Sequence, residues 1–342
     1  MGDTVRAVLV GCGGMSAAWL NAVRNIGGIE MVGFVDLDEE AAAKRRDEYG
    51  WTSVATGTDL ASLLSAVSAD CVFDCTIPDA HYGITMTALS RGLHVLGEKP
   101  LADTMAHARE MVDAAAKARK IFAVIQNRRY MPIIRRYRDL VQSGAIGEIT
   151  TVNSDFYIGA HFGGFRDRMK HVLLLDMAIH TFDQARLISG SDASKVFCKE
   201  WNPAGSWYDH DASAIAIFTM KNGAVYTYRG SWCSEGLNTS WECEWRVIGS
   251  RGSAIWDGRE GIRASAASEE DGFIRPQADV SVPDLRETTK EGGHQGLLRE
   301  FVAAIRTGQV PETAASDNIK SLAMVFAAIE SAEAGREVEV QA

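Results

Sequence analysis

An apolar run that ends abruptly in a cluster of glycines constrains the fold of this chain more than any other feature. Val5–Val10 read VRAVLV, and GCGG follows at Gly11–Gly14. This pattern is typical of a β-strand that turns into the start of a helix, where bare backbone N–H groups can bind a pyrophosphate. Gly11 permits the tight turn, and Gly13 lets the backbone approach the phosphates because it lacks a Cβ. Ser16 replaces the third glycine of the usual fingerprint, which suggests looser helix–strand packing there.

The next apolar run supports the same interpretation. Met31–Val35 are followed directly by Asp36, and an acidic residue at this place can accept hydrogen bonds from an adenosine ribose while repelling a 2′-phosphate. The pattern therefore predicts a dinucleotide-binding domain that favours NAD over NADP. Arg45 and Arg46 lie on the next predicted helix and could approach a 2′-phosphate, but we expect them to face solvent.

Composition narrows the class of protein. A chain of 342 residues with 46% apolar residues suits two domains with large cores. The net charge of −10 argues against a nucleic-acid partner, because a polyanion needs a basic face. No apolar run approaches the roughly 20 residues of a membrane span. The six cysteines lack the spacing of metal ligands, so we expect a reduced, cytoplasmic protein without a metal.

Residues 1–125 alternate strand and helix patterns, which predicts a doubly wound α/β domain of the Rossmann type that binds NAD(P). The expected strands are Val5–Val10, Met31–Asp36, Cys71–Thr76, His94–Leu96 and Ile121–Ile125. The clearest expected helices are Glu39–Tyr49, Ala80–Arg91 and Met105–Arg119.

Residues 126–342 predict an α+β domain for substrate binding and oligomerisation. Its core is expected to be an open antiparallel or mixed β-sheet with helices on one face. Asn222-Gly223 separates two alternating runs within Lys195–Trp256, which is a strong hairpin signal, and a second hairpin follows. The other expected elements are a helix over Pro132–Ser143, a strand over Glu148–Phe156, a helix over Asp176–Ser189, a surface loop over Ser268–Gly293 and two helices over Gly296–Ala334, which can pack back on the first domain.

Two segments at the carboxyl ends of expected strands are candidates for chemistry, because ligands of doubly wound sheets bind there. Thr76-Ile77-Pro78 follows one strand and Gly97-Glu98-Lys99-Pro100 follows the next. A lysine fixed by the following proline can hold a substrate hydroxyl, and a nearby nicotinamide would lower its pKa. The same pattern also fits an ordinary surface lysine at a turn.

Asp176 and His180 form the second candidate constellation. Spaced four residues apart on a predicted helix, they share one face. A histidine beside a carboxylate suits a proton shuttle that also grips adjacent hydroxyls. A solvated helix face and a core histidine are the alternatives, and a metal pair lacks a third ligand at recognisable spacing. Asp183, on a similar face, is expected to support the helix.

The order of these motifs resembles the Gfo/Idh/MocA family, named for glucose–fructose oxidoreductase, inositol dehydrogenase and rhizopine catabolism. The matching segments are VGCGGM at 10–15, Asp36, TIPDAH at 76–81, GEKPLA at 97–102, QNRRYMP at 126–132 and LLDMAIHTFDQ at 174–184. The resemblance covers nearly the whole chain. It implies that Lys99 is catalytic or orients the substrate, that His180 donates and accepts the proton, and that Asp176 holds a hydroxyl. It also implies a cis Lys99–Pro100 bond.

One departure from the family pattern concerns substrate specificity. Many members carry glycines before the Asp-x-x-x-His motif, whereas this chain has Lys170-His171-Val172-Leu173-Leu174. Lys170 and His171 are therefore candidate specificity residues. Further hydrogen bonds to a sugar could come from Arg129, Tyr157, His161, Arg166 and Arg168.

The second domain is also rich in tryptophan, whose faces suit the C–H faces of sugar rings. Six tryptophans fall in its sheet-forming stretch: Trp201, Trp207, Trp232, Trp241, Trp245 and Trp256. A core or a subunit interface would use the same residues. An open sheet of this kind needs a cover, so we expect a homodimer or homotetramer formed through it.

These observations predict a dehydrogenase that acts on a CH–OH group and transfers a hydride between a sugar, sugar derivative or cyclitol and NAD. The alternatives are an NAD-dependent, redox-neutral glycoside hydrolase and a non-catalytic nicotinamide-binding regulator. Residues expected to bind the cofactor are Gly11, Cys12, Gly13, Gly14, Met15, Asp36, Thr76, Pro78, His81, Glu98, Lys99 and Gln126. Residues expected to bind the substrate are Lys99, Arg129, Tyr157, Arg166, His171, Asp176 and His180, of which Lys99, Asp176 and His180 are the expected catalytic group.

Overall fold

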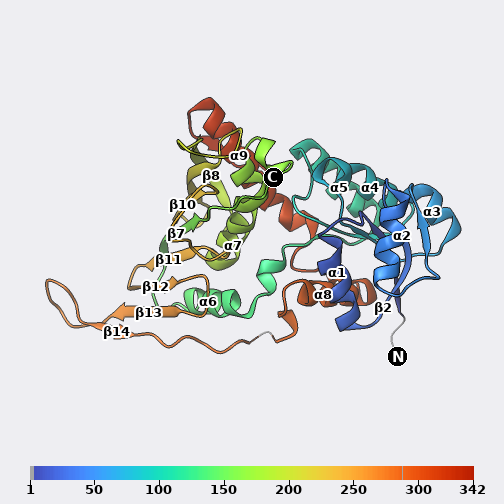
Figure 1. The fold of residues 1–342 in the computed structure, drawn as a ribbon. Coiled ribbons are helices and arrows are strands. Elements are labelled where there is room, and N and C mark those ends of the chain that lie inside the picture. The colour runs from blue at the N-terminus through green and yellow to red at the C-terminus, as the bar shows by residue number, and fades with distance from the viewer. Residues whose placement is uncertain (1–3, 287) are drawn as a thin grey trace. The chain divides into compact units, whose positions relative to one another are not determined.

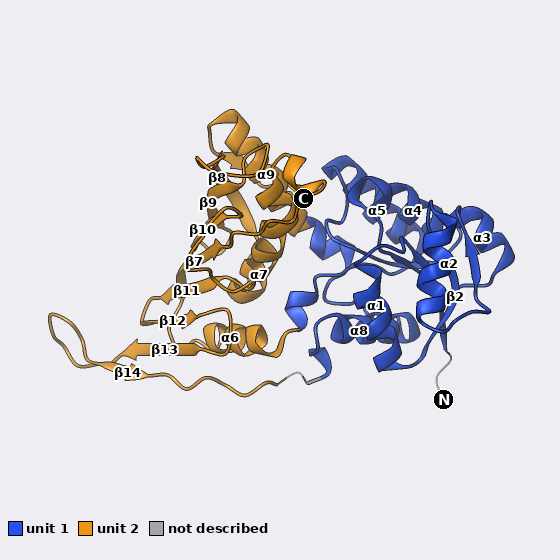
Figure 2. Cartoon of the chain, in the orientation of Figure 1, with its two compact units in different colours: residues 1–130, 289–319 blue, residues 131–288, 320–342 orange. Residues whose placement is uncertain are grey.

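The structure, a computed structural model, describes residues 4–286 and 288–342 (Figure 1). The chain divides into two compact units (Figure 2). Unit 1 comprises residues 1–130 and 289–319, and unit 2 comprises residues 131–288 and 320–342.

Unit 1 is built on a six-stranded sheet whose strand order is β3-β2-β1-β4-β5-β6. The strands are β1 (Val5–Val10), β2 (Ile29–Val35), β3 (Ala55–Gly57), β4 (Cys71–Asp74), β5 (His94–Gly97) and β6 (Phe122–Val124). All pairings are parallel. This is the order of a Rossmann fold, in which ligands bind where the order reverses, beside β1 and β4. The predicted Rossmann fold is confirmed, although β3 was not predicted because three residues show no periodicity.

Helices of unit 1 follow the strands, and one returns from far along the chain. The helices are α1 (Ser16–Ile26), α2 (Glu39–Glu48), α3 (Leu60–Ala66), α4 (Pro78–Ser90), α5 (Met105–Ala118) and α8 (His294–Thr307), with short turns η1 (Asn127–Tyr130) and η4 (Thr288–Lys290). Helix α8 packs against α1, and its Leu298 and Phe301 are fully buried in the cluster that contains Trp19 and Phe73. The core of unit 1 is therefore completed by residues that lie about 170 positions after η1.

Unit 2 is built on a nine-stranded sheet of order β14-β13-β12-β11-β7-β10-β9-β8-β15. The strands are β7 (Ile149–Tyr157), β8 (Ala193–Trp201), β9 (Ser213–Met220), β10 (Val225–Ser231), β11 (Glu244–Gly249), β12 (Gly252–Trp256), β13 (Ile262–Ala267), β14 (Gln277–Asp279) and β15 (Val338–Glu339). Strands β7 and β10 run parallel and the other pairings are antiparallel, so the sheet is mixed. The predicted hairpins are present as β9–β10 and β11–β12.

Helices cover one face of this sheet. They are α6 (Pro132–Gln142), the π-helical turn η3 (Leu173–Ala178), α7 (Ile179–Ser189) and α9 (Ala315–Ala334), and a short turn η2 (Arg166–Arg168) precedes η3. Along β9 the side chains alternate, so that Phe218 is fully buried while Ile215 and Ile217 are exposed. In this chain one face of the sheet therefore packs on helices and the other carries exposed apolar side chains.

Two expectations for unit 2 are wrong in detail. Ser268–Gly293 is not a loop throughout, because β14 pairs with β13 in a hairpin that is prominent in Figure 1. The helix expected over Asp176–Ser189 begins earlier, in the π-helical turn η3. A three-residue strand and an irregular helical turn leave no period in the sequence that could have predicted them.

The helices that the structure describes include none long and apolar enough to cross a bilayer. Within the same residues, no group of three or more His, Cys, Asp or Glu side chains is arranged to hold a metal ion.

Candidate functional site

The glycine loop at the end of β1 has the geometry that its sequence predicts. Gly11 has φ +86°, and a Cβ there would lie 2.7 Å from the carbonyl carbon and oxygen of Cys75. Gly13 and Gly14 instead face open space, with nothing within 4 Å of an added Cβ. The helix α1 that follows has no side-chain cap, whereas α2, α3 and α5 are each capped by an acid or a threonine. No side chain therefore occupies the start of α1, which leaves room there for an anionic ligand.

Asp36 anchors this loop from the end of β2. Its Oδ2 accepts a hydrogen bond from the backbone N–H of Cys12 (2.8 Å), and its Oδ1 accepts one from the N–H of Asp38 (3.0 Å). Burial and the carboxylate of Asp36 raise the pKa of Cys12 to about 12, so Cys12 is present as a thiol. Each carboxylate oxygen retains a lone pair with which it can accept a further hydrogen bond.

Two arginines of α2 were expected to face solvent, but they are only partly exposed and bind backbone carbonyls, so the expectation is wrong in part. Arg45 donates from Nε to the carbonyl of Cys12 (3.3 Å) and from Nη2 to that of Gly13 (3.0 Å). Arg46 donates to the carbonyl of Val54 (3.3 Å) and pairs with Asp47. The two hydrogen bonds from Arg45 to loop carbonyls fasten the loop to α2.

A buried network lies at the end of β4. The Asp74 carboxyl, which is fully buried, accepts hydrogen bonds from the N–H and Oγ1 of Thr76 (3.0 and 2.6 Å). Its other oxygen lies 2.9 Å from Nδ1 of His81, and an ionised carboxylate requires that nitrogen to carry the proton. Nε2 of His81 has no hydrogen-bond partner among the described residues. Thr76 and His81 were predicted to bind the cofactor, but Asp74 was missed, although an aspartate inside an apolar strand was a usable signal.

Glu98 and Lys99 lie at the end of β5. The Glu98 carboxyl accepts hydrogen bonds from Nε1 of Trp19 (2.8 Å) and from the backbone N–H of Lys99 (3.2 Å), and burial raises its pKa. The Lys99–Pro100 peptide bond is cis, as the family resemblance implies. Trp19 belongs to α1, so one hydrogen bond connects the helix of the glycine loop to the strand end that carries Lys99. No local pattern links residues 79 positions apart, and sequence reasoning missed Trp19.

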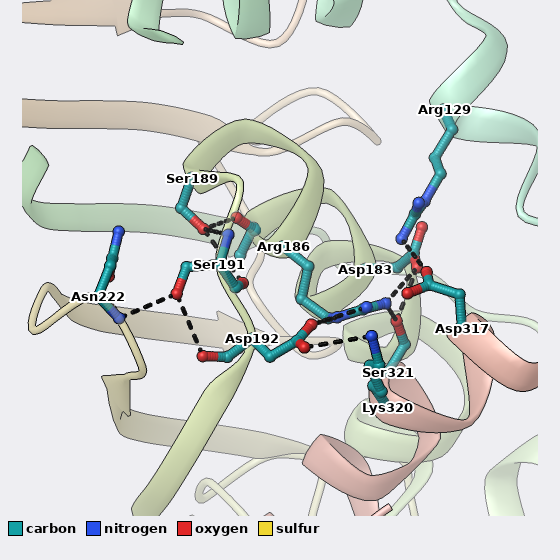
Figure 3. Close-up of polar contacts among 11 residues, drawn as sticks. Arg129, Asp183, Arg186, Ser189, Ser191, Asp192, Asn222, Asp317, Lys320 and Ser321 are labelled. Carbon is teal, nitrogen blue, oxygen red and sulfur yellow. Dashed lines mark hydrogen bonds and ion pairs between the residues drawn. The ribbon is translucent and has the colours of Figure 1, made fainter. Parts of the chain in front are cut away.

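Gln126 and Arg129 follow β6. The Gln126 side chain is 1% exposed, and neither its Oε1 nor its Nε2 has a partner among the described residues. A buried amide in this state is costly, and it fits a ligand that supplies a matching donor and acceptor. Arg129, predicted to bind substrate, is buried in unit 1 with Asp317 at 3.6 Å (Figure 3). Pro78 is the first residue of α4.

These features of unit 1 fit NAD. Gly13 and Gly14 leave room for phosphates at an uncapped helix start, Asp36 can accept from a ribose, and Gln126 can pair with a carboxamide.

In unit 2 the predicted pair of Asp176 and His180 spans the junction between a π-helical turn and an α-helix. Asp176 is in the π-helical turn η3, and His180 is in the first turn of α7. The guanidinium of Arg166 holds the Asp176 carboxylate in two hydrogen bonds, Nε to Oδ2 at 2.8 Å and Nη2 to Oδ1 at 3.4 Å. Arg166 was predicted to bind substrate, but its pairing with Asp176 was missed, because the two residues are ten positions apart in segments without a regular period, where no spacing rule applies.

A buried polar cluster holds α7 in place (Figure 3). The hydroxyl of Ser321 donates to Asp183 (2.7 Å) and accepts from Nη1 of Arg186 (2.9 Å). Nε of Arg186 also donates to Asp192 (2.9 Å). Asp183 therefore bonds to α9, and the turn that carries His180 rests on a firmly connected helix.

Other residues predicted to contact substrate lie around β7 and β8. His171, with φ +52°, pairs through Nδ1 with the buried Glu200 at 2.6 Å, and this hydrogen bond raises the pKa of His171. Tyr157 ends β7, and burial raises its pKa. His161 stacks on Trp207 with ring centroids 3.7 Å apart. Lys170 is exposed.

The tryptophans divide between core and surface. Trp232, Trp245 and Trp256 are buried, whereas Trp201 and Trp241 are among the exposed large side chains. The alternative that tryptophans of this stretch pack a core therefore holds for the first three.

Comparisons with known proteins agree with this geometry. Residues 5–126 match the oxidoreductase family with an NAD-binding Rossmann fold, and residues 134–255 match the GFO/IDH/MocA C-terminal domain. The uncharacterized protein y4oX of Sinorhizobium fredii is 32% identical, covering 99% of this chain and 96% of that protein. D-apiose dehydrogenase of Paraburkholderia graminis is 28% identical, with 98% and 90% covered. An oxidoreductase from Agrobacterium radiobacter, solved with NAD+, L-tartaric acid and magnesium, has a TM-score of 0.85 at 21% identity, with 98% of each chain covered. The chain belongs to the Gfo/Idh/MocA family of oxidoreductases, and it combines the family's NAD-binding Rossmann domain with its C-terminal domain.

Proposed function

We propose that this protein is an NAD-dependent dehydrogenase that acts on a secondary hydroxyl of a sugar, sugar derivative or cyclitol. The observation that carries the proposal is the pairing, in one chain, of a cofactor-ready strand edge bearing Lys99 with a helix bearing Asp176 and His180. A protein that only binds nicotinamide has no need of all three side chains. The related D-apiose dehydrogenase supports a sugar-like substrate.

The proposed mechanism assigns one task to each of these side chains. The Lys99 ammonium orients the substrate hydroxyl, and His180 accepts its proton. Asp176, held by Arg166, orients the hydroxyl and favours the protonated imidazole of His180. The chemistry supplied by bound NAD is acceptance of a hydride from the carbinol carbon. The protein itself contributes position and proton management.

The cofactor preference follows from Asp36. Its carboxylate is fixed by the N–H groups of Cys12 and Asp38 and can accept a further bond from a ribose hydroxyl. A 2′-phosphate at the same place would meet a negative charge, so we propose NAD as the preferred cofactor.

Assembly and compartment belong to the same proposal. The exposed face of the unit 2 sheet carries Phe197, Ile215, Ile217, Val225 and Ile248, a set of apolar residues that favours burial against a second copy. We therefore propose a homodimer or homotetramer, which light scattering after gel filtration would test. The six cysteines are free thiols, which supports a reducing, cytoplasmic environment.

The first experiment is an NADH-forming screen of the purified protein with NAD+ and NADP+ separately, against aldoses, anhydrosugars, uronates and inositols. We expect one substrate class to reduce NAD+, with NADP+ much poorer. Tight NADH binding, measured by fluorescence, together with no turnover across the panel would overturn the proposal in favour of a regulator. Product formation without accumulation of NADH would indicate the redox-neutral hydrolase.

A further inference from the structure

We propose that the substrate carries a carboxylate close to its reacting hydroxyl, and that Arg166 binds this carboxylate. The substrate class is thereby narrowed to sugar acids such as uronates or aldonates. This inference rests on the proposed function and deepens it.

Arg166 is held rigidly at the edge of the predicted catalytic residues. Its Nε and Nη2 bind the carboxylate of Asp176. The guanidinium also lies 5.0 Å from the ring centroid of Phe162 and 4.8 Å from that of Phe165. Gly163 and Gly164, with φ +68° and +73°, let the chain turn so that two rings reach one guanidinium. Arginine held by two rings and an acid is pre-organised for recognition.

One side of this guanidinium is unused. Asp176 takes the edge formed by Nε and Nη2, and Nη1 donates to no acceptor among the described residues. The side chain is 32% exposed, so a ligand can reach it. A planar fork of two N–H groups matches a carboxylate in two parallel hydrogen bonds, a fit that a neutral hydroxyl cannot equal.

Local charge supports an acidic ligand. Arg168 and Lys170 follow Arg166 closely and are exposed. The chain as a whole has a net charge of −10 and would repel an acid, so a basic segment beside the predicted catalytic residues reduces that repulsion at the proposed substrate site.

The position of Asp176 sets the spacing within the substrate. Its carboxylate is bound directly by Arg166, and it is the residue proposed to hold a substrate hydroxyl. A carboxylate on Arg166 and a hydroxyl on Asp176 must then lie within a few bonds of each other. Uronates and aldonates satisfy this requirement, and simple aldoses lack the acid.

The test compares substrates that differ only in the acid: glucuronate against glucose and galacturonate against galactose, with the NAD-loaded enzyme. We expect a higher kcat/KM for the acid in at least one pair. Arg166→Met should raise KM for that acid by about 10- to 100-fold, the value of a lost charged hydrogen bond, and leave its preference over the neutral sugar abolished. Arg166→Lys should recover part of the preference, because it keeps the charge without the fork. Arg263→Met, on the exposed side of β13, is the matched control and should retain the preference.

The outcomes separate this inference from the function beneath it. Oxidation of neutral sugars at least as efficiently as their acids by the wild-type protein would overturn the role of Arg166 and leave the dehydrogenase intact. An acid preference that survives in Arg166→Met, with NADH binding unchanged, would also overturn it. If neither member of any pair is oxidised, the proposed function itself fails. Should Arg166→Met not fold, the wild-type preference and Arg166→Lys still decide.

Discussion

The two units present their functional groups in different ways. In unit 1 the groups are backbone N–H donors and side chains at strand ends, fixed by a parallel sheet and its glycine turn. In unit 2 they are pairs of side chains from distant or irregular segments, such as Arg166 with Asp176 and His171 with Glu200. A site formed by backbone can be seen in a short stretch of sequence, whereas a site formed by side-chain pairs depends on the whole packed unit.

The largest expected effect is the loss of turnover in a variant that still binds the cofactor. We expect His180→Ala to lower kcat by about 10²- to 10⁴-fold, because a positioned acid–base group is lost. NADH binding, measured by fluorescence titration, should be retained, since its groups belong to unit 1. The control is His107→Ala, a half-buried residue at the start of α5 that pairs with Asp103, and this variant should turn over normally. Normal turnover by His180→Ala would remove the residue from the mechanism.

The dependence of unit 2 on side-chain pairs predicts a large loss of stability. Arg186→Met removes a cation that contacts the buried Asp183, and we expect this to cost about 3–5 kcal/mol in urea unfolding. The control is Lys320→Met, whose partly exposed ion pair with Asp192 should contribute less than about 1 kcal/mol. Equal losses of unfolding free energy in the two variants would show that burial does not make the Arg186 pair more stabilising than the Lys320 pair.

The backbone site of unit 1 can be tested with two glycines. Gly11→Ala forces a positive φ and a 2.7 Å contact with Cys75, so we expect a loss of about 1–3 kcal/mol. Gly13→Ala meets no protein atom within 4 Å and should keep its stability while binding NADH more weakly, because its Cβ points toward the phosphates. Thermal unfolding and NADH titration of the two variants give the comparison. Full NADH affinity in Gly13→Ala would place the phosphates elsewhere.

The smallest expected effect is on how stability depends on pH, which should differ between a histidine of unit 2 and one of unit 1. In unit 2, the hydrogen bond that His171 donates to the Glu200 carboxylate raises the pKa of His171 above 6.5. The pair therefore adds stability that is present below pH 6.5 and is lost as the pH rises through the raised pKa of His171. Burial raises the pKa of Glu200 as well, so the contribution falls again in acid, once Glu200 is protonated.

We expect the free energy of unfolding of the wild type to exceed that of His171→Gln by on the order of 1 kcal/mol near pH 6. This difference in stability should shrink toward pH 9. His94 in unit 1 gives the opposite trend: burial lowers its pKa to about 4, whereas the unfolded chain still binds a proton at this residue near pH 6. The stability of wild type relative to His94→Gln should therefore rise, not fall, as the pH increases from 6 toward 9. A constant difference for His171→Gln would contradict the assigned pair.

The sequence predicts much of unit 1 because its strands and turns are determined by short local patterns. The Rossmann strands follow from buried apolar runs, and Gly11, Asp36 and Lys99 stand at strand ends where the fold requires them. It does not predict Trp19 on Glu98 or Arg45 on the loop carbonyls, because these contacts form only after helices pack. In unit 2 the hairpin at Asn222-Gly223 was predicted from its turn residues.

Where local signals end, prediction ends as well. The π-helical turn at Asp176 has no period to read, and strand β14 is three residues long. The burial of Arg129 with Asp317 joins segments almost 190 residues apart. Such pairs are set by tertiary packing, which single-sequence patterns do not encode.

Helix α8 has a consequence for how the chain acquires its structure during synthesis. Leu298 and Phe301 fill the cluster beside Trp19 and Phe73, so a ribosome that has released only residues 1–130 has produced a Rossmann sheet with an uncovered apolar side. Helix α8, which covers that side, is synthesised only after residues 131–288 have emerged. Newly made chains should therefore be open to chaperone binding and proteolysis for most of their translation, and a gene fragment ending at residue 130 should yield an aggregation-prone product rather than a small NAD-binding protein.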